Sequence, residues 1–193
     1  MGLTDVAPST APVWLVPASS VCVALGVFFW LVAYVLMVRR SLETKATPVP
    51  IVALALNLAW EVVWAVYVSD TVIERLSFGG WLLLDIPVLY ATFQTAKHSF
   101  ASQPLVARNF GLIMGVSFVI CLAANAYFAC WWFAEPHRGY GLKWGKTWRG
   151  LEARDMTELS YWTAGAAQTA FSVGALAMLL KRGHSGGQSF GIW

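Results

Sequence analysis

Five long apolar runs, separated by short charged segments, constrain the fold of this chain most strongly. Each run is about as long as the roughly 20 residues that a helix needs to cross the hydrocarbon core of a bilayer. The sequence therefore predicts an all-α fold, a polytopic transmembrane helical bundle that forms a single domain over residues 1–193. We place its five spanning helices at about 14–38, 48–68, 78–97, 107–133 and 158–180.

Composition and charge agree with a membrane protein. Hydrophobic residues make up 58% of the chain and charged residues 12%, with a mean hydropathy of +0.61, and soluble globular domains carry about twice that share of charge. The net charge of +3 is modest, and the basic residues flank the apolar runs, where they would meet lipid headgroups. The bilayer is thus an expected partner and nucleic acid is not. The positive-inside rule predicts one cytoplasmic side that carries Arg39, Arg40, Lys45, Lys97, Arg108, Lys181 and Arg182.

The segment from Glu135 to Arg154 is expected to be an interfacial amphipathic segment. Its aromatic and aliphatic residues recur at helical spacing with lysines and arginines between them, a pattern typical of segments that lie in the membrane interface. Two roles remain open, a surface anchor or a lid over a substrate entrance. Its basic residues lie on the side opposite to the other cations, so they weaken the assignment of orientation.

Glu61 is a carboxylate in the middle of the second apolar run. A charged side chain near the centre of a spanning helix costs roughly 2.5–3.5 kcal/mol on insertion scales, so such a group is normally paired, neutralised or used. Asn57 and Trp64 lie one turn before Glu61 and about one turn after it, which places an amide, an acid and an aromatic ring on one helical face. This pattern indicates a functional site.

Asp85 is a second acid inside a spanning helix, one turn after Trp81. Pro87 follows two residues later and can kink that helix locally. A lone acid in this position could simply hydrogen-bond to another helix as a packing contact. Two acids on neighbouring helices, each beside a tryptophan, favour a functional pair.

Such a pair suits proton donation in an apolar cavity, because a carboxyl group away from water favours its neutral form and can then act as a general acid. Aromatic faces would stabilise a cation formed by that proton. Most of the eleven tryptophans are expected to be interface anchors, but Trp60 and Trp64 lie beside the acid. The candidate catalytic residues are Glu61 and Asp85, and the candidate substrate-binding residues are Asn57, Trp60, Trp64, Trp81, Tyr90, Asn125, Trp132, Glu158, Trp162 and Gln168.

Some of these candidates have simpler explanations. Asn125 could equally be a packing contact, and Glu158 at a helix N-terminus could cap backbone amides and interact with the helix dipole. The three cysteines lack the spacing of a metal site and are expected to be buried structural thiols. The sequence also lacks a DDxxD-like acidic cluster for magnesium and diphosphate. We therefore expect neither a metal ion nor a cofactor.

The motif Asn57-Leu-Ala-Trp-Glu61, followed by Trp81-Leu-Leu-Leu-Asp85, resembles the small membrane-integral terpene cyclases. These include cyclases of fungal meroterpenoid and indole-diterpene pathways and bacterial cyclases of drimentine-type indole sesquiterpenoid pathways. The resemblance covers the second and third predicted helices well and the final residues, 186–193, loosely. The motif is moderately specific, because a Trp-Glu pair inside a spanning helix is rare.

The resemblance implies a protonation-initiated cyclisation of a prenylated aromatic substrate, with a farnesylated indole as the expected example, that has an alkene or epoxide end. Glu61 would be the proton donor or its partner, in an enzyme of the isomerase or lyase type. Fungal members have about seven spanning helices and an important acid near the C-terminus. With five helices here, either Asp85 or Glu158 serves instead, or the chain is a shortened bacterial type, which would place it in the bacterial cytoplasmic membrane.

Two other functions compete with this hypothesis. A small proton-coupled transporter or sensor for hydrophobic molecules could use Glu61 and Asp85 to handle protons, and in a structural scaffold both acids would be packing contacts. A cyclase needs a closed pocket with an acid at its end, whereas a transporter needs access from both sides of the membrane.

Overall fold

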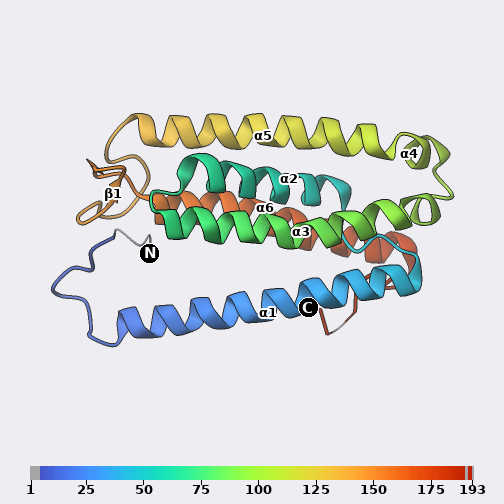
Figure 1. Cartoon of the computed structure of the whole chain (residues 1–193), viewed down its shortest axis with the longest axis horizontal. Coiled ribbons are helices and arrows are strands. Elements are labelled where there is room, and N and C mark those ends of the chain that lie inside the picture. The colour runs from blue at the N-terminus through green and yellow to red at the C-terminus, as the bar shows by residue number, and fades with distance from the viewer. Residues whose placement is uncertain (1–4, 190, 193) are drawn as a thin grey trace.

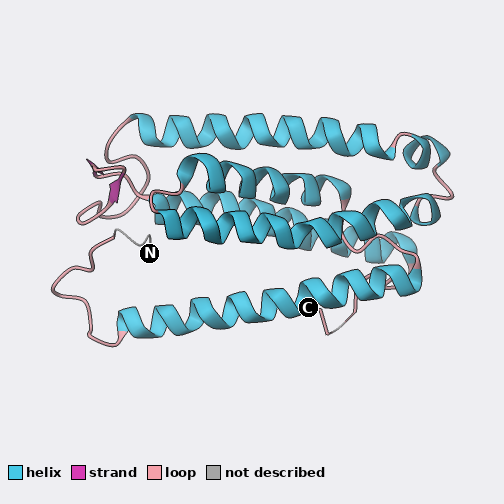
Figure 2. Ribbon diagram, viewed as in Figure 1, coloured by secondary structure: helices cyan, strands magenta, loops and turns pink. Residues whose placement is uncertain are grey.

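The computed structural model describes residues 5–189, 191 and 192, and in this part of the chain long helices lie side by side along one axis (Figures 1 and 2). Five of its helical spans are long and apolar enough to cross a membrane, which confirms the predicted transmembrane bundle. The helices are α1 (Leu15–Thr44), α2 (Ile51–Val63) continued by the π-helix η1 (Trp64–Val68), α3 (Val72–Ser99), the short α4 (Pro104–Arg108), α5 (Phe110–Ala134) and α6 (Met156–Arg182).

The second span, α2 with η1, is the central helix of the bundle. It packs against α5, α3 and α6, whereas α1 packs mainly against α3 at the edge (Figure 1). In the second span 56% of the residues are buried inside the protein, compared with 11% of the most apolar stretch of α1. Glu61 therefore belongs to the helix that is most enclosed by protein.

Two helix boundaries differ from the prediction because of local capping. The first helix does not end before Arg39 but continues to Thr44, where Lys45 adopts a left-handed conformation. Arginines are good helix formers, and Arg39 forms an i,i+4 ion pair of 2.7 Å with Glu43. The third helix begins six residues earlier than predicted, because Thr71 and Glu74 form a capping box.

The remaining boundaries follow from proline and from capping. Pro50 precedes the first residue of α2 in an extended conformation, so this helix begins later than the predicted residue 48. The fourth run is divided near Asn109 into α4 and α5. The last helix begins at Met156 because Asp155 accepts a hydrogen bond from the backbone N–H of Glu158, so Asp155 is the N-cap. Pro87 lies inside α3 without ending it.

The amphipathic segment between α5 and α6 is not a helix. It contains a small antiparallel hairpin, β1 (Thr147–Trp148) paired with β2 (Leu151–Glu152), and otherwise irregular chain (Figure 2). Helical spacing of its apolar residues was therefore misleading. The physical reason is backbone conformation, because four glycines of the segment have positive φ angles that a helix cannot accommodate, namely Gly139, Gly141, Gly145 and Gly150.

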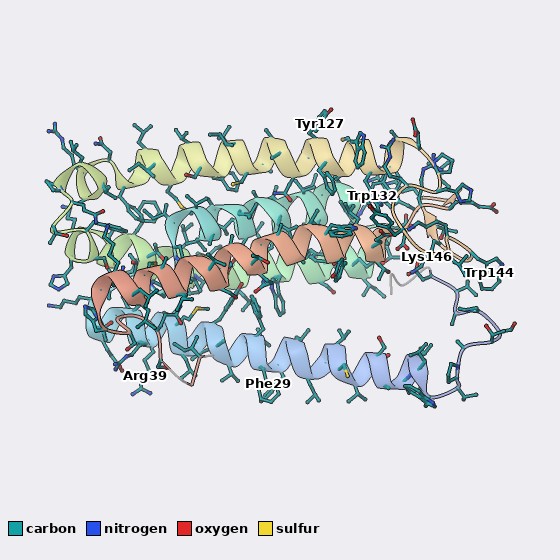
Figure 3. All side chains as sticks on the ribbon, turned by 180° about the vertical axis from the view of Figure 1, so that it is seen from behind. Phe29, Arg39, Tyr127, Trp132, Trp144 and Lys146 are labelled. Carbon is teal, nitrogen blue, oxygen red and sulfur yellow. The ribbon has the colours of Figure 1, made fainter. Side chains whose placement is uncertain are left out.

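This segment forms a cap over one end of the bundle, which we call the hairpin cap (residues 135–154). The ring of Trp148 stacks on Phe133 at 4.0 Å, and its Nε1 donates a hydrogen bond of 2.8 Å to the Val68 carbonyl. The buried Lys143 ammonium forms ion pairs with Asp155, at 3.5 Å, and with Glu158. Figure 3 shows Lys146 and Trp144 at the same end. The cap is thus anchored to the helix ends by aromatic and ionic contacts.

The other end of the bundle carries the residues that follow α6. Arg182 donates a hydrogen bond of 2.8 Å to Thr47 Oγ1 in the loop between α1 and α2, and the Gln188 amide donates to the Pro48 carbonyl. Gly187 lies so close to this loop that a Cβ atom would be 2.6 Å from the Ala46 carbonyl oxygen. A residue with a side chain would not fit there without a shift of the backbone.

The outer faces of the helices carry apolar side chains, such as Phe29 of α1 and Tyr127 of α5, which point away from the bundle (Figure 3). Cys22 and Cys130 are also exposed on these faces. The expectation that the cysteines are buried was therefore wrong for these two. Their small apolar side chains suit a helix surface that faces lipid as well as a protein core.

The hairpin cap leads to a prediction about stability. The substitution Lys143→Met should destabilise the protein by roughly 3–5 kcal/mol, because it leaves the largely buried carboxyl of Glu158 without its cation and Asp155 with Lys146 alone. Thermal unfolding of the detergent-solubilised protein would measure the change. Arg39→Gln is the matched control, since its partner Glu43 is exposed and the melting temperature should stay nearly unchanged. Equal melting temperatures for both variants would contradict the role of Lys143.

Candidate functional site

Asn57 joins the two intramembrane acids. Its Nδ2 group donates one hydrogen bond of 2.9 Å to Glu61 Oε1 and another of 2.7 Å to Asp85 Oδ2. All three side chains are buried, with exposed fractions of 3%, 0% and 1% for Asn57, Glu61 and Asp85. Residues 28 positions apart in sequence thus form one polar cluster, which we call the acid pair with its bridging amide.

Local structure explains how this cluster forms. Asn57 and Glu61 lie one turn apart on α2, so both side chains project from one face of the central helix. The antiparallel neighbour α3 presents Asp85 to that face. The second carboxyl oxygen of Glu61, Oε2, is buried and has no hydrogen-bond partner among the described residues. Buried polar atoms usually have a partner, so an orphaned carboxyl oxygen inside a bundle is a feature of functional sites.

Tyr34 of α1 completes the cluster from a third helix. Its ring lies 6.3 Å from that of Trp81 and 5.9 Å from that of Trp30, measured between ring centroids. The side chain is buried, with an exposed fraction of 6%, and it lies close enough to Asp85 for the two side chains to interact. The Tyr34 hydroxyl nevertheless has no hydrogen bond of ordinary geometry to any described residue.

Sequence reasoning did not include Tyr34 among the site residues. The signal that could have found it is weak, because it is a hydroxyl in the middle of a spanning helix one turn after Trp30. Aromatic pairs of this kind are common in membrane helices, and only the packing of α1 against α3 reveals that this one faces Asp85.

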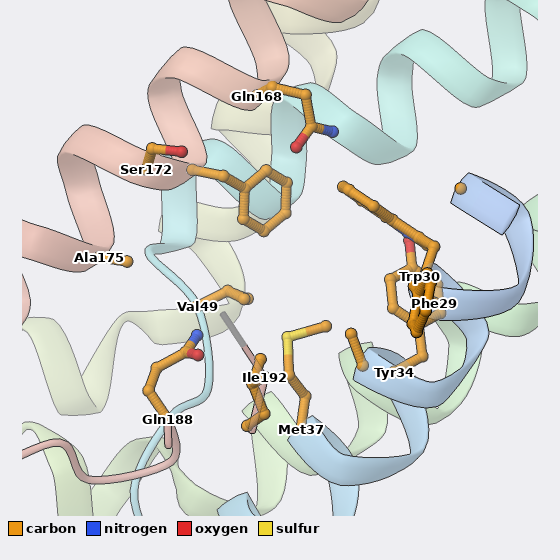
Figure 4. A pocket seen from close by; sticks show the side chains of 13 residues that line it. Phe29, Trp30, Tyr34, Met37, Val49, Gln168, Ser172, Ala175, Gln188 and Ile192 are labelled. Carbon is orange, nitrogen blue, oxygen red and sulfur yellow. The ribbon is translucent and has the colours of Figure 1, made fainter. Parts of the chain in front are cut away.

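Two adjacent cavities lie between α1 and α6, in front of the acid pair. The first, the Tyr34 cavity, has a volume of 350 Å³, with Trp30 and Tyr34 on one side and Gln168 and Ser172 on the other (Figure 4). The second, the Trp81 cavity, has a volume of 450 Å³. Both are lined by Trp30 and Gln168, so they are neighbours that meet at these two side chains. The residues around the Trp81 cavity include Trp30, Asn57, Trp60, Phe78, Trp81 and Gln168.

A third cavity of 790 Å³ lies at the ends of α1 and α6 and is called the Arg182 cavity here. It shares Ser172, Ala175 and Gln188 with the Tyr34 cavity, so the three cavities follow one another along α6. Its lining is more polar at the far end, where it contains Arg40, Arg182, Ser185 and Ser189. The series therefore runs from an aromatic region near the acid pair to a basic end.

The structure brings part of the predicted site together. Asn57, Trp60, Trp81 and Gln168 all line the Trp81 cavity. Trp64 lies one layer further into the core, where its ring packs against those of Trp60 at 5.4 Å and Phe78 at 5.0 Å. The acids themselves lie behind the bridging amide, and neither Glu61 nor Asp85 is among the residues that line the three cavities. Among the described residues, no third His, Cys, Asp or Glu joins these two carboxyl groups.

The structure does not bring the other five candidates to the acid pair. Tyr90 is 57% exposed on the outer face of α3, and Asn125 donates its hydrogen bond to the Cys121 carbonyl of its own helix. The remaining three, Trp132, Glu158 and Trp162, belong to the end that carries the hairpin cap. Helical spacing shows which residues share a face of a helix, but it does not show what packs against that face. For this reason these five residues were grouped with the site. Their role in substrate binding stays a prediction.

The three candidates at the cap make contacts among themselves and with the cap. Trp132 Nε1 donates to the Asp155 carbonyl at 3.0 Å, and Trp162 Nε1 donates to Glu158 at 3.2 Å. The Glu158 carboxyl also accepts the Tyr140 backbone N–H at 2.7 Å and pairs with Lys143. These bonds explain the positions of the three side chains as parts of the cap.

Several fungal proteins are similar to this chain. The terpene cyclase ascF of Acremonium egyptiacum is 33% identical over 186 residues, which cover 96% of this chain and 65% of the relative. The terpene cyclase dpchB of Colletotrichum higginsianum is 31% identical, with 94% of this chain and 65% of the relative covered. The Pyr4-family terpene cyclase mfmH of Annulohypoxylon moriforme is 26% identical over 85% of this chain and 59% of the relative.

The chain spans about 65% of the length of the first two of these relatives, and no solved structure matches it. Because these relatives are fungal, they do not support the expectation of a bacterial membrane. A family model described as Pyr4-like transmembrane terpene cyclases matches residues 5–193. This match confirms the resemblance drawn from the Asn57–Glu61 motif, and the chain belongs to the Pyr4-like transmembrane terpene cyclases.

Proposed function

We propose that this chain is a membrane terpene cyclase that starts cyclisation by protonating the end of a prenyl chain. The observation that carries the proposal is the acid pair, in which the Asn57 amide bridges Glu61 and Asp85 directly behind an aromatic cavity. Membership in a family whose named relatives are terpene cyclases supports the same function.

The acid pair is suited to hold a transferable proton. Two ionised carboxylates that share one amide inside an apolar bundle would repel each other and would be poorly solvated, so the arrangement favours one neutral carboxylic acid. That acid is the source of the proton that adds to the terminal alkene or epoxide of the substrate, and the double bonds of the chain then close the rings by attacking the cation. Loss of a proton from the final cation restores the acid pair, so substrate and product are isomers.

Aromatic side chains around the Trp81 cavity suit the cations of such a reaction. Trp60, Trp81 and Phe78 line this space, and a cation over an aromatic face gains roughly 0.5–2 kcal/mol. The indole Nε1 of Trp60 donates a hydrogen bond of 2.8 Å to Thr163 Oγ1, which holds the orientation of that ring. Aromatic rings are also poor nucleophiles, so they would stabilise the cation without trapping it.

The series of cavities suits an amphiphilic substrate, such as a farnesylated indole or another prenylated aromatic compound. Gln168 and Arg182 are separated by roughly 20 Å along α6 at the helical rise per residue. We place the prenyl end where the Trp81 and Tyr34 cavities meet, beside Trp30 and Gln168, and the polar aromatic head group toward the basic Arg182 cavity. This orientation brings the reacting end of the chain next to the acid pair.

The proposed activity can be tested with membranes that contain the protein. They are incubated with farnesylated indole and with an epoxide of a prenylated aromatic compound, and the products are separated by chromatography and mass spectrometry. A new product of unchanged mass supports cyclisation. Movement of unaltered substrate across sealed vesicles, with no isomer formed, would favour a transporter instead.

A substitution that keeps the shape of Glu61 but removes its acidity should slow catalysis strongly. In Glu61→Gln the amide oxygen can still accept the hydrogen bond from Asn57, but the side chain cannot deliver a proton. We expect turnover to fall by about 10²–10⁴, the usual contribution of a general acid, in a protein that still inserts into the membrane. Product formation per minute measures the loss. Glu43→Gln on the exposed end of α1 is the control, and a wild-type rate in Glu61→Gln would rule out its role as an acid.

The aromatic lining should control which product forms. Trp60→Leu and Trp81→Leu keep apolar surface but remove the ring face that stabilises a cation. We expect slower turnover together with partly cyclised or hydrated products, which chromatography would resolve from the native product. Trp144→Leu, at an exposed position of the hairpin cap, should leave the product unchanged. If both cavity variants formed the native product at the native rate, the lining would have no part in guiding the cation.

A further inference from the structure

The acid pair is separated from the cavities in which a substrate would bind. Glu61 and Asp85 are almost completely buried, and neither lines a cavity. A proton from this pair therefore needs a group that contacts both the acids and the cavity. The residues near the acids that line a cavity carry three kinds of N–H or O–H group, namely the amide of Asn57, the phenol of Tyr34 and the indoles of Trp30, Trp60 and Trp81.

Chemistry distinguishes these three kinds of group. Both hydrogens of the Asn57 amide are engaged, one by Glu61 and one by Asp85, and an amide N–H is not an acid in water. The indole N–H of a tryptophan such as Trp30, Trp60 or Trp81 is a hydrogen-bond donor only, so it cannot receive a second proton as it gives one up. A phenol both donates and accepts hydrogen bonds, so it can give one proton and receive another. Among the three, only Tyr34 has the chemistry of a relay.

The position of Tyr34 agrees with this chemistry. Its side chain is buried between Trp30 and Trp81, close to Asp85, and it forms one wall of the Tyr34 cavity (Figure 4). The hydroxyl oxygen is buried and makes no hydrogen bond of ordinary geometry with a described residue. Leaving a buried donor unsatisfied costs about 1–3 kcal/mol, so we expect this hydroxyl to accept from the neighbouring Asp85 carboxyl and to donate to a ligand in the cavity.

We propose that Tyr34 is the catalytic residue that hands the proton to the substrate, and that Asp85 supplies that proton to Tyr34. This inference deepens the proposed cyclase function and rests on it. Tyr34 then contacts the reacting end of the prenyl chain, and the Asn57 bridge keeps Glu61 beside Asp85 so that the two acids share the proton that is passed on.

The proton transfer balances in each step. The Tyr34 O–H bond breaks as a new C–H or O–H bond forms at the alkene carbon or epoxide oxygen of the substrate, and the electron pair of the O–H bond stays on the phenol oxygen. The Asp85 carboxyl O–H bond breaks in the same step and re-forms the Tyr34 O–H bond, which leaves Asp85 as a carboxylate. After ring closure the final cation loses one proton, and that proton returns to the acid pair.

The first experiment removes only the hydroxyl. Tyr34→Phe keeps the ring contacts with Trp30 and Trp81, so we expect little change in KM and a fall in kcat of at least about 100-fold. The control is Tyr127→Phe on α5, which removes an identical hydroxyl from a side chain that is 75% exposed, and it should keep the wild-type kcat. Assays use the full chain in membranes with the prenylated substrates named above.

A second measurement separates a relay from a structural role. Tyr34 is replaced by tyrosines with one, two or three ring fluorines, which make the phenol progressively more acidic while keeping its hydroxyl. In a relay the single-turnover rate and its solvent deuterium isotope effect change with the number of fluorines. In a structural role neither quantity follows the acidity of the phenol. This test also remains informative if Tyr34→Phe does not fold.

The outcomes distinguish the two proposals. If the wild-type protein forms no isomer from any prenylated substrate, the proposed cyclase function fails and the relay fails with it. If the wild-type protein is active and Tyr34→Phe has the same kcat, the relay is overturned and the cyclase function stands. A fluorine series with unchanged rates and isotope effects overturns the relay in the same way.

Discussion

The two hydrogen bonds from the Asn57 amide are the interaction on which the rest of the site depends. They hold two carboxyl groups together inside the bundle, where each would be costly alone. They also tie α2 to α3 through polar contacts at a depth where few other groups can hydrogen-bond. Such contacts are worth roughly 1 kcal/mol between membrane helices, so their main effect is to set the relative position of the two helices. The relative position of α2 and α3 in turn sets the shape of the Trp81 cavity, which residues of both helices line.

The bundle separates structural from chemical tasks along its length. At one end, the hairpin cap closes the helices with stacked rings and buried ion pairs, as in the contacts of Trp148 and Lys143. At the other end, Arg182 and Gln188 attach the residues after α6 to the loop between α1 and α2. The middle of the bundle has fewer polar contacts, and there the acid pair and the aromatic cavities lie. A rigid frame at both ends allows the central cavities to keep their shape without bonds across them.

Sequence patterns predicted this protein well where the relevant contacts are local. Hydropathy and length predicted five spans, and i,i+4 spacing predicted that Asn57 and Glu61 share a face. The pairing with Asp85 followed from the adjacency of two consecutive helices. Tyr34 was missed because its relation to Asp85 depends on how the edge helix α1 packs, which no local pattern encodes. The hairpin cap was wrongly predicted to have helical spacing, because the prediction used the positions of its apolar residues and not its glycines, which adopt positive φ angles.

The bridging amide has a consequence for the symmetry of the site. An amide nitrogen has two hydrogens, so Asn57 treats both acids alike, but their surroundings differ. Asp85 has a phenol beside it at the edge of a cavity, whereas Oε2 of Glu61 has no hydrogen bond of ordinary geometry to a described residue. The two acids have the same chemistry but different neighbours, a phenol beside Asp85 and an unpaired oxygen on Glu61. With the proposed relay, this difference gives a proton inside the membrane one direction in which to leave, from Asp85 through Tyr34 into the cavity.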